Sequence, residues 1–294
     1  MDERFAAGRE FLLREGRLLE RRLFAACFDG AAGDGAVDAL KGYLNGDGGF
    51  GHGLEPDKRC PDSLPVDVEF ALRTMVAAQT DDPPLVRAAC EYLGQVAEEA
   101  DRGGAVPLAF PIIEAYPRAA HWTEWTYEPG LNPTAGLVGL LYGLEADHPW
   151  ISTAAQYCWD ALESADLPTD AHALSEILVF LDHTPERDRA DAAAQKVRDR
   201  LAEADWFRLD PDTEGYGLSP LDVAPFADSR WRALFEDEVL EAHLDLLERE
   251  QQADGGWPIR WDPPSEAALF EWRGIVTLQA LRTLASFGRV DTES

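Results

Sequence analysis

The segment Gln251-Gln252-Ala253-Asp254-Gly255-Gly256-Trp257 decides the fold, because a second copy of it lies near the start of the chain. That copy reads Asn45-Gly46-Asp47-Gly48-Gly49-Phe50, with its aspartate 207 positions before Asp254. Matching helical segments follow, Ala71-Leu72-Arg73-Thr74-Met75 and Ala280-Leu281-Arg282-Thr283-Leu284, 209 positions apart. Two consecutive glycines allow a positive φ and close backbone approach. The chain therefore contains a repeated unit that buries its apolar face only by stacking against neighbouring units.

Helical periodicity dominates the rest of the chain. Residues 3–28 are expected to form one amphipathic, charged helix, and the same spacing recurs over 34–44, 64–79, 85–101, 133–146, 150–165, 170–183, 187–204, 232–252 and 267–287. Gly136 and Gly139 indicate close packing of one of these helices against a neighbour. Alternating Val/Ile/Thr runs with Asn-Gly or Asp-Gly hairpin turns are missing from the sequence. We predict an all-α fold in a single domain, residues 1–294, with helix 3–28 packed on it.

Composition restricts the partners of the protein. Asp and Glu number 55 against 26 Lys and Arg, giving a formal net charge of −29. This charge excludes nucleic-acid binding through phosphate contacts and docking on anionic membranes, and its mutual repulsion favours a monomer. No apolar run is long enough for a membrane span, and the N-terminal segment differs from a signal peptide. Four cysteines without a CxxC pair indicate free thiols in a reducing compartment.

A cytoplasmic protein without a cofactor is therefore expected, although the sequence leaves a divalent cation open. The acidic composition has two explanations. Only three of the basic residues are lysines, Lys41, Lys58 and Lys196. This pattern is typical of halophilic proteins, whose carboxylates keep the surface hydrated, and also of proteins encoded by GC-rich genomes.

The segment 251–257, preceded by Leu246-Leu247, resembles the QW repeat of squalene–hopene cyclases and the related prenyltransferase β-subunits. The copy at 45–51 resembles the prenyltransferase form of the same turn. The resemblance implies an α/α toroid, a ring of about five to six helical hairpins around a central cavity. It also implies a terpenoid-cyclase-like or prenyltransferase-like enzyme for a hydrophobic substrate such as an isoprenoid. The DxDD and DDxxD motifs of such enzymes are missing from the sequence, so carboxylate acid–base chemistry would replace them.

The offset of 209 aligns Asp62 with Glu271, each at or near the start of an expected inner helix. Two carboxylates on opposing walls of a cavity can act as general acid and general base. Structural roles compete with this hypothesis. Asp62 or Ser63 can cap the following helix, and Glu271 can form an ion pair with Arg273.

The segment 46–63 is the densest in polar residues. Glu55 and Asp57 are further catalytic candidates, and His52 is a candidate for substrate binding. Mixed His, Arg and carboxylate groups beside a tandem-glycine turn are typical of an active-site loop. A calcium-binding loop is an alternative, although the spacing differs from that of an EF-hand. A solvated acidic loop is the other alternative.

Two more loops, 103–132 and 205–231, combine aromatic and polar residues. Aromatic rings can stabilise a carbocation or stack on a sugar ring, whereas a buried aromatic lid and helix caps are the structural alternatives. The substrate-binding candidates outside 46–63 are His121, Trp122, Trp125, Tyr127, Asn132, Tyr216, Asp222, Asp228, Trp257, Trp272 and Arg273. The remaining histidines, His148, His172, His183 and His243, are expected to be surface or helix residues.

Two other functions stay open beside the isoprenoid enzyme. A carbohydrate-active α/α-toroid enzyme, either a glycoside hydrolase or a lyase, fits acids placed among Trp and Tyr residues, and it predicts an open polar groove. The isoprenoid enzyme predicts a closed apolar pocket instead. A non-enzymatic binding or scaffold protein predicts a centre filled with side chains.

Overall fold

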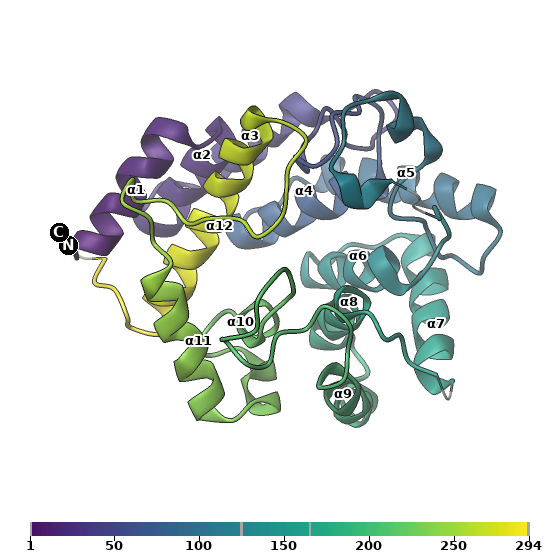
Figure 1. Cartoon of the computed structure of the whole chain (residues 1–294). Helices are drawn as coiled ribbons and strands as arrows, with labels where there is room; N and C mark the ends of the chain where they lie inside the picture. Colours follow the sequence, from purple (N-terminus) through teal and green to yellow (C-terminus); the bar gives the residue numbers. More distant parts are fainter. Residues whose placement is uncertain (1, 124–125, 165, 293–294) are drawn as a thin grey trace.

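The computed structural model describes residues 2–123, 126–164 and 166–292 (Figure 1). Within these ranges the α-helices are α1 (Glu3–Glu15), α2 (Leu18–Phe28), α3 (Asp34–Leu40), α4 (Pro65–Ala78), α5 (Pro83–Ala100), α6 (Leu131–Gly143), α7 (Pro149–Glu163), α8 (Ala171–His183), α9 (Arg187–Leu201), α10 (Pro220–Val223), α11 (Asp237–Arg249) and α12 (Glu266–Ser286). Short 3₁₀ helices are η1 (Lys41–Tyr43), η2 (Pro111–Ala115), η3 (Ala120–Trp122) and η4 (Arg230–Leu234). Extended pairing in the described ranges is limited to isolated bridges. The all-α prediction is confirmed.

The prediction of one helix over residues 3–28 is wrong. Helix α1 ends at Glu15 and α2 begins at Leu18, because Gly16 has an extended backbone (φ −67°, ψ 147°). Gly16 lies directly against α12, where a Cβ on Gly274 would stand 3.3 Å from its Cα. The break also lets Arg17 donate a hydrogen bond to the carbonyl of Leu54 at 2.8 Å. The N-terminal helices are thus tied to the loop that holds the candidate site.

Most of the even-numbered helices contact one another in chain order. Helix α4 contacts α2 and α6, and α8 contacts α6 and α10. Helix α12 contacts α2, and α11 lies between it and α10 in the contact order. The odd-numbered helices pack against this inner set, for example α3 on α4, α7 on α6 and α9 on α8. Figure 1 shows α5, α7, α9 and α11 toward the periphery. This contact order resembles that of a ring of helical hairpins, with α11 between α10 and α12, and the toroid itself stays a prediction.

Helices α6 and α8 pack closely at the glycines of α6. A Cβ on Gly139 would stand 2.4 Å from the backbone oxygen of Val179, far inside van der Waals contact. A Cβ on Gly136 would stand 1.7 Å from Oε2 of Glu176. The prediction that these two glycines allow close helix packing is confirmed.

The two copies of the repeated turn have the same hydrogen bonds. The amide of Gly49 donates to Oδ1 of Asp47 at 3.0 Å, and the amide of Gly256 donates to Oδ1 of Asp254 at 3.1 Å. In each copy, the side chain of the aspartate thereby stabilises the turn by accepting from the amide two residues later. The repeat read from the sequence is therefore a repeat of structure.

Each turn also packs against a peripheral helix through its first glycine. Gly48 (φ 88°) and Gly255 (φ 92°) have left-handed backbones that favour glycine. A Cβ on Gly48 would stand 2.7 Å from the carbonyl oxygen of Ala88 in α5, and one on Gly255 would stand 2.2 Å from that of Ala7 in α1. Helices α5 and α1 therefore occupy equivalent places in the two repeats.

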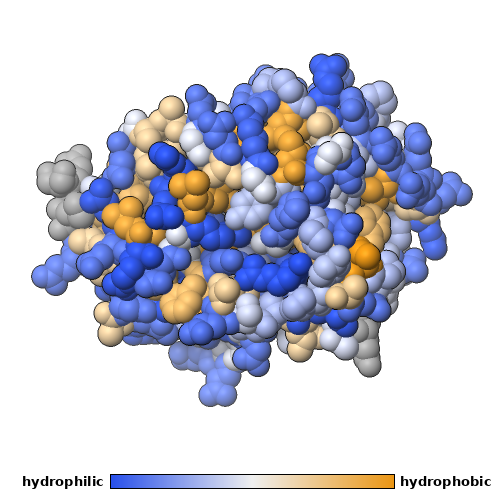
Figure 2. Space-filling view, turned by 90° about the horizontal axis from the view of Figure 1, so that it is seen from above, coloured by the Kyte–Doolittle hydropathy of each residue, from blue (hydrophilic) through white to orange (hydrophobic). Residues whose placement is uncertain are grey.

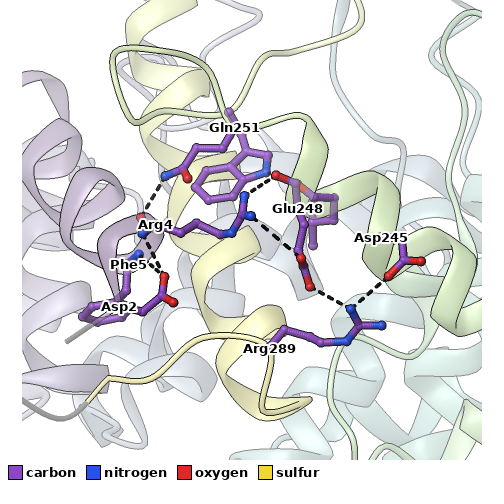
Figure 3. A network of polar contacts seen from close by, with 9 residues as sticks. Asp2, Arg4, Phe5, Asp245, Glu248, Gln251 and Arg289 are labelled. Carbon is purple, nitrogen blue, oxygen red and sulfur yellow. Dashed lines mark hydrogen bonds and ion pairs between the residues drawn. The ribbon is translucent and has the colours of Figure 1, made fainter.

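A polar network fastens α1 to the second turn and to α11 (Figure 3). The side-chain amide of Gln251 donates to the carbonyl of Arg4 at 2.9 Å. Arg4 lies 3.8 Å from the carboxylate of Glu248, which also accepts from Arg289 at 2.8 Å. Arg289 reaches Asp245 at 2.9 Å as well. Residues from both ends of the chain thus stabilise the same corner of the molecule.

The surface agrees with the acidic composition. Figure 2 shows a face covered mainly by hydrophilic side chains, with small and separate hydrophobic areas. Among the residues that the structure describes, no helix is both long enough and apolar enough to cross a membrane. All four cysteines are free.

Candidate functional site

The loop between η1 and α4 carries charged residues into the interior. Glu55 is 8% exposed, Asp57 3% and Lys58 1%. The alternative of a solvated acidic loop is therefore wrong for this part of the segment. Burial of charged groups is costly unless each finds a partner, so the partners of these residues define the site.

Asp57 lies among aromatic nitrogens. Its Oδ1 accepts hydrogen bonds from the indoles of Trp272 at 2.8 Å and Trp261 at 3.2 Å, and its Oδ2 lies 3.4 Å from Nε2 of His121. Burial raises the pKa of Asp57 to about 7, the charge of Glu55 adds to the rise, and the two indole bonds oppose it. The carboxyl is therefore divided between its protonated and ionised forms near neutral pH. Burial also lowers the pKa of His121.

A buried ion pair is formed by the residues that flank Asp57 in the same loop. Glu55 pairs with Lys58, whose ammonium group lies 4.6 Å from the ring centre of Trp122. The amide of Glu55 donates to Oδ1 of Asp67 at 2.7 Å. Burial raises the pKa of Asp67 to about 7. The loop is thus held by buried polar contacts to α4, and this fixes the position of Asp57.

Glu271 and Arg273 have different partners from those expected. Glu271 pairs with Arg59 at 2.7 Å and ties α12 to the buried loop. Arg273 instead donates two hydrogen bonds to the carboxylate of Asp254, at 2.7 and 2.8 Å. The alternative of a Glu271–Arg273 ion pair is therefore wrong. Trp257 is 2% exposed, and its backbone carbonyl accepts a hydrogen bond from Nε of Arg273 at 3.1 Å. Trp257 and Arg273, both candidates for substrate binding, are packed into the second turn.

Asp62 lies in a different environment. It is exposed, accepts from the Cys60 thiol at 3.6 Å, and lines an open groove of about 560 Å³ together with His52 and Asn45. Neither Asp62 nor Ser63 caps the following helix, whose N-cap is Leu64 without a side-chain bond. The alternative of a cap is therefore wrong.

An aromatic wall extends from Asp57. The rings of Trp261 and Trp272 meet edge to face with centroids 5.0 Å apart, and Tyr216 meets Trp261 in the same way at 5.6 Å. The ring centroid of Phe70 on α4 lies 6.3 Å from that of Trp272. Tyr216 and Trp272 are sequence candidates that the structure connects. Trp261 was not predicted, although it lies in the long loop that follows the second turn.

A hydrogen-bonded relay ends at the same wall. Nδ1 of His172 lies 2.8 Å from Oδ1 of Asp170, and its Nε2 lies 2.6 Å from the hydroxyl of Tyr216. The His172 and Tyr216 rings stack at 5.7 Å. Burial acts to raise the pKa of Asp170, but the bonds from His172 outweigh it and lower that pKa. The expectation from the sequence that His172 is an ordinary surface or helix residue did not include these contacts. Their signal in the sequence is Asp170-Ala171-His172 at the start of a helix.

A second charged cluster, partly exposed at Arg73, joins α4 to α8. Arg73 donates to Glu69 at 2.6 Å and to both oxygens of Glu176 at 2.8 and 2.6 Å. Burial, together with the nearby charge of Glu69, raises the pKa of Glu176 to about 8. Phe70, the neighbour of Glu69, contacts Trp272, so this cluster adjoins the aromatic wall.

The remaining candidates are scattered. Asp222 accepts from the amide and hydroxyl of Ser219 at 2.7 Å and so closes the capping box of α10, a short helix that the sequence did not predict. Asp228 is exposed. The Tyr127 hydroxyl donates to Glu114 at 3.0 Å. Asn132 has an extended backbone at the start of α6 (φ −96°, ψ 113°). Trp125 lies outside the described residues.

Within the described part of the chain, no three His, Cys, Asp or Glu side chains are grouped so that they could hold a metal ion. Comparison with protein-family models gives no match, and comparison with curated proteins gives no significant match either. The proposals for function therefore depend on the geometry of the site.

Proposed function

We propose that the protein is a carbohydrate-active enzyme that cleaves a glycosidic bond, with Asp57 as the proton donor. The observation that carries the proposal is the buried Asp57 carboxyl between the indoles of Trp261 and Trp272, with a pKa of about 7. Cleavage of a glycosidic bond needs a carboxylic acid that keeps its proton near neutral pH so that it can protonate the leaving oxygen.

The wall next to Asp57 supports a sugar as the substrate. Trp261, Trp272 and Tyr216 place aromatic rings beside polar groups, and sugars present apolar C–H faces edged with hydroxyls. The net charge of −29 favours an uncharged sugar over an anionic one, since the field of the whole protein repels anions.

The contact order of the helices supports an α/α toroid as the scaffold of this site. In such a ring, loops at one end of the inner helices converge on the central cavity. The groups around the aromatic wall come from well-separated segments, namely 54–59, 170–172, 205–219 and 261–272. Their convergence is the arrangement that a toroid would produce.

An isoprenoid cyclase or isomerase is the second candidate. The aromatic rings of Phe70, Trp261 and Trp272 beside a protonated carboxyl favour it, because ring faces stabilise a carbocation. We place it second because protonation of an alkene requires a much stronger acid than a carboxyl group with a pKa of about 7.

The test compares the wild-type protein with Asp57→Asn and Asp62→Asn on two substrate panels. One holds neutral oligosaccharides and nitrophenyl glycosides, and the other holds squalene and prenyl diphosphates. We expect glycoside hydrolysis that falls by about 10²–10⁴-fold in Asp57→Asn and stays near wild type in Asp62→Asn. The reverse pattern would move the acid to the outer groove. Turnover of isoprenoids alone would select the second candidate, and turnover of neither panel by folded wild-type protein would contradict both.

A further inference from the structure

We propose that Tyr216, activated by His172 and Asp170, deprotonates the attacking water, so that the hydrolysis inverts the anomeric configuration. This inference rests on the proposed function, in which Asp57 protonates the leaving oxygen. Tyr216 is thus a catalytic residue, His172 accepts a proton, and Asp170 positions His172. Neither Asp170 nor His172 is a candidate from the sequence alone.

The first support is the order of hydrogen bonds along the relay. The Asp170 carboxylate, 2.8 Å from Nδ1 of His172, selects the tautomer that carries its proton on Nδ1. The lone pair of Nε2 then accepts the Tyr216 hydroxyl at 2.6 Å. A reactive hydroxyl bonded to a histidine, with the histidine oriented by a carboxylate, is the arrangement that activates hydroxyl groups in many enzymes.

The second support is the position of Tyr216 at the wall. Its ring contacts Trp261, and the Trp261 indole donates to Asp57. Tyr216 is 37% exposed, so a ligand and a water molecule can approach it. The proton donor and the proton acceptor are thus separated by one indole ring. Inverting glycosidases need such a separation, because a water molecule must fit beside the sugar.

The third support is the rigidity of the loop that carries Tyr216. The amide of Arg208 donates to Leu218 at 2.7 Å, and the amide of Leu218 donates to Trp206 at 2.8 Å. The Arg208 side chain is buried and donates to the carbonyls of Thr213 at 2.9 Å and Pro211 at 3.0 Å. The loop is therefore preorganised, which a catalytic side chain requires.

Burial raises the pKa of Tyr216, and nearby carboxylates add to the rise. The phenol therefore keeps its proton until the reaction begins. In the step, the water oxygen bonds to the anomeric carbon and its proton passes to the Tyr216 oxygen, while the hydroxyl proton passes to Nε2 of His172. At the same time the bond to the leaving oxygen breaks and that oxygen takes the proton of Asp57. Exchange with solvent then returns a proton to Asp57 and removes one from His172.

The experiment follows the anomer formed by the wild-type protein by ¹H NMR on the neutral glycoside that it hydrolyses best. It then measures kcat and KM for Tyr216→Phe and His172→Ala. Matched controls are Tyr157→Phe on the peripheral helix α7 and His183→Asn, whose imidazole lies 3.9 Å from Asp182 at the other end of α8. Melting curves show which variants fold.

We expect inversion, a fall in kcat of about 10²–10⁴-fold for Tyr216→Phe with KM changed only a few-fold, and near-wild-type controls. Added imidazole should restore part of the activity of folded His172→Ala, which it would not do for a histidine that only supports the fold. Retention of configuration, or full kcat in Tyr216→Phe while Asp57→Asn is inactive, would overturn the relay and leave the proposed function intact. Absence of glycoside hydrolysis by the wild-type protein would overturn both.

Discussion

The indole of Trp272 donates a hydrogen bond to the carboxylate of Asp57 at 2.8 Å, although 215 positions of sequence separate the two residues. Trp272 lies on α12, after the second copy of the repeated turn, and Asp57 lies in the loop after the first copy. The bond therefore joins the loop that precedes α4 to the last helix, α12. It also helps to set the pKa of the group on which the proposed chemistry depends.

Trp257 should be the main anchor of the second turn. It is 2% exposed, and its indole donates to the carbonyl of Leu247 at 2.7 Å. Trp257→Ala is expected to lower the free energy of unfolding by about 3–5 kcal/mol, because it leaves a large cavity. Chemical denaturation measures this loss. Trp206→Ala is the matched control, since Trp206 is 60% exposed and its removal should cost less than about 0.5 kcal/mol. Equal losses in the two variants would contradict the anchor role.

Gly139→Ala should separate α6 from α8. The new methyl group would stand 2.4 Å from the carbonyl oxygen of Val179, and backbone cannot move aside cheaply. A loss of about 1–3 kcal/mol or more in the free energy of unfolding is expected from this overpacking. Gly42→Ala provides the comparison, because nothing lies within 4 Å of its Cβ position. A Gly139→Ala protein of wild-type stability would show that the two helices pack less tightly than the 2.4 Å approach implies.

The buried Asp67 should make stability depend on pH. Its folded-state pKa of about 7 exceeds the ordinary value of 3.8, so its stabilising contribution is complete below about pH 4 and is lost as pH rises through 7. Asp67→Asn removes this ionisation but keeps an oxygen for the Glu55 amide. We expect the drop in unfolding free energy between pH 5 and pH 8 to shrink by roughly 2–4 kcal/mol in the variant. An unchanged drop would mean that Asp67 ionises normally in the folded protein.

Salt should distinguish the two explanations of the acidic surface. Screening of repulsion among surface carboxylates is largely complete at about 1 M salt, where the Debye length is about 3 Å. If the protein is adapted to salt, its Tm in KCl should continue to rise well above that concentration. A Tm that levels off once repulsion is screened would favour codon bias as the origin of the charge of −29.

Local signals in the sequence predicted most of the fold. The helical spacing located the main helices, and the tandem glycines of the repeated turn marked two segments that have the same hydrogen bonds. The break at Gly16 escaped prediction, because the helical spacing continues on both sides of it and its contact is with the distant α12. A contact with a distant helix leaves no periodic trace in the 3–28 segment.

The site was only partly predictable. Asp57 stood out because His and Arg interrupt the acids around it, and it proved to be buried. Asp170 and His172 did not stand out, because an aspartate two residues before a histidine is also common at the start of a helix. Asp170 does cap α8. Their role in a relay becomes visible only when Tyr216, 44 positions after His172, comes within 2.6 Å.

The most direct test of the account is the titration of the Asp57 carboxyl by ¹³C NMR, with Asp57→Asn used to assign its signal. We expect a pKa of about 7, and a further rise in Trp272→Phe, because that variant removes a hydrogen bond to the ionised form. A pKa of about 4, the ordinary value for aspartate, would show that Asp57 is ionised at neutral pH and would contradict its role as the proton donor.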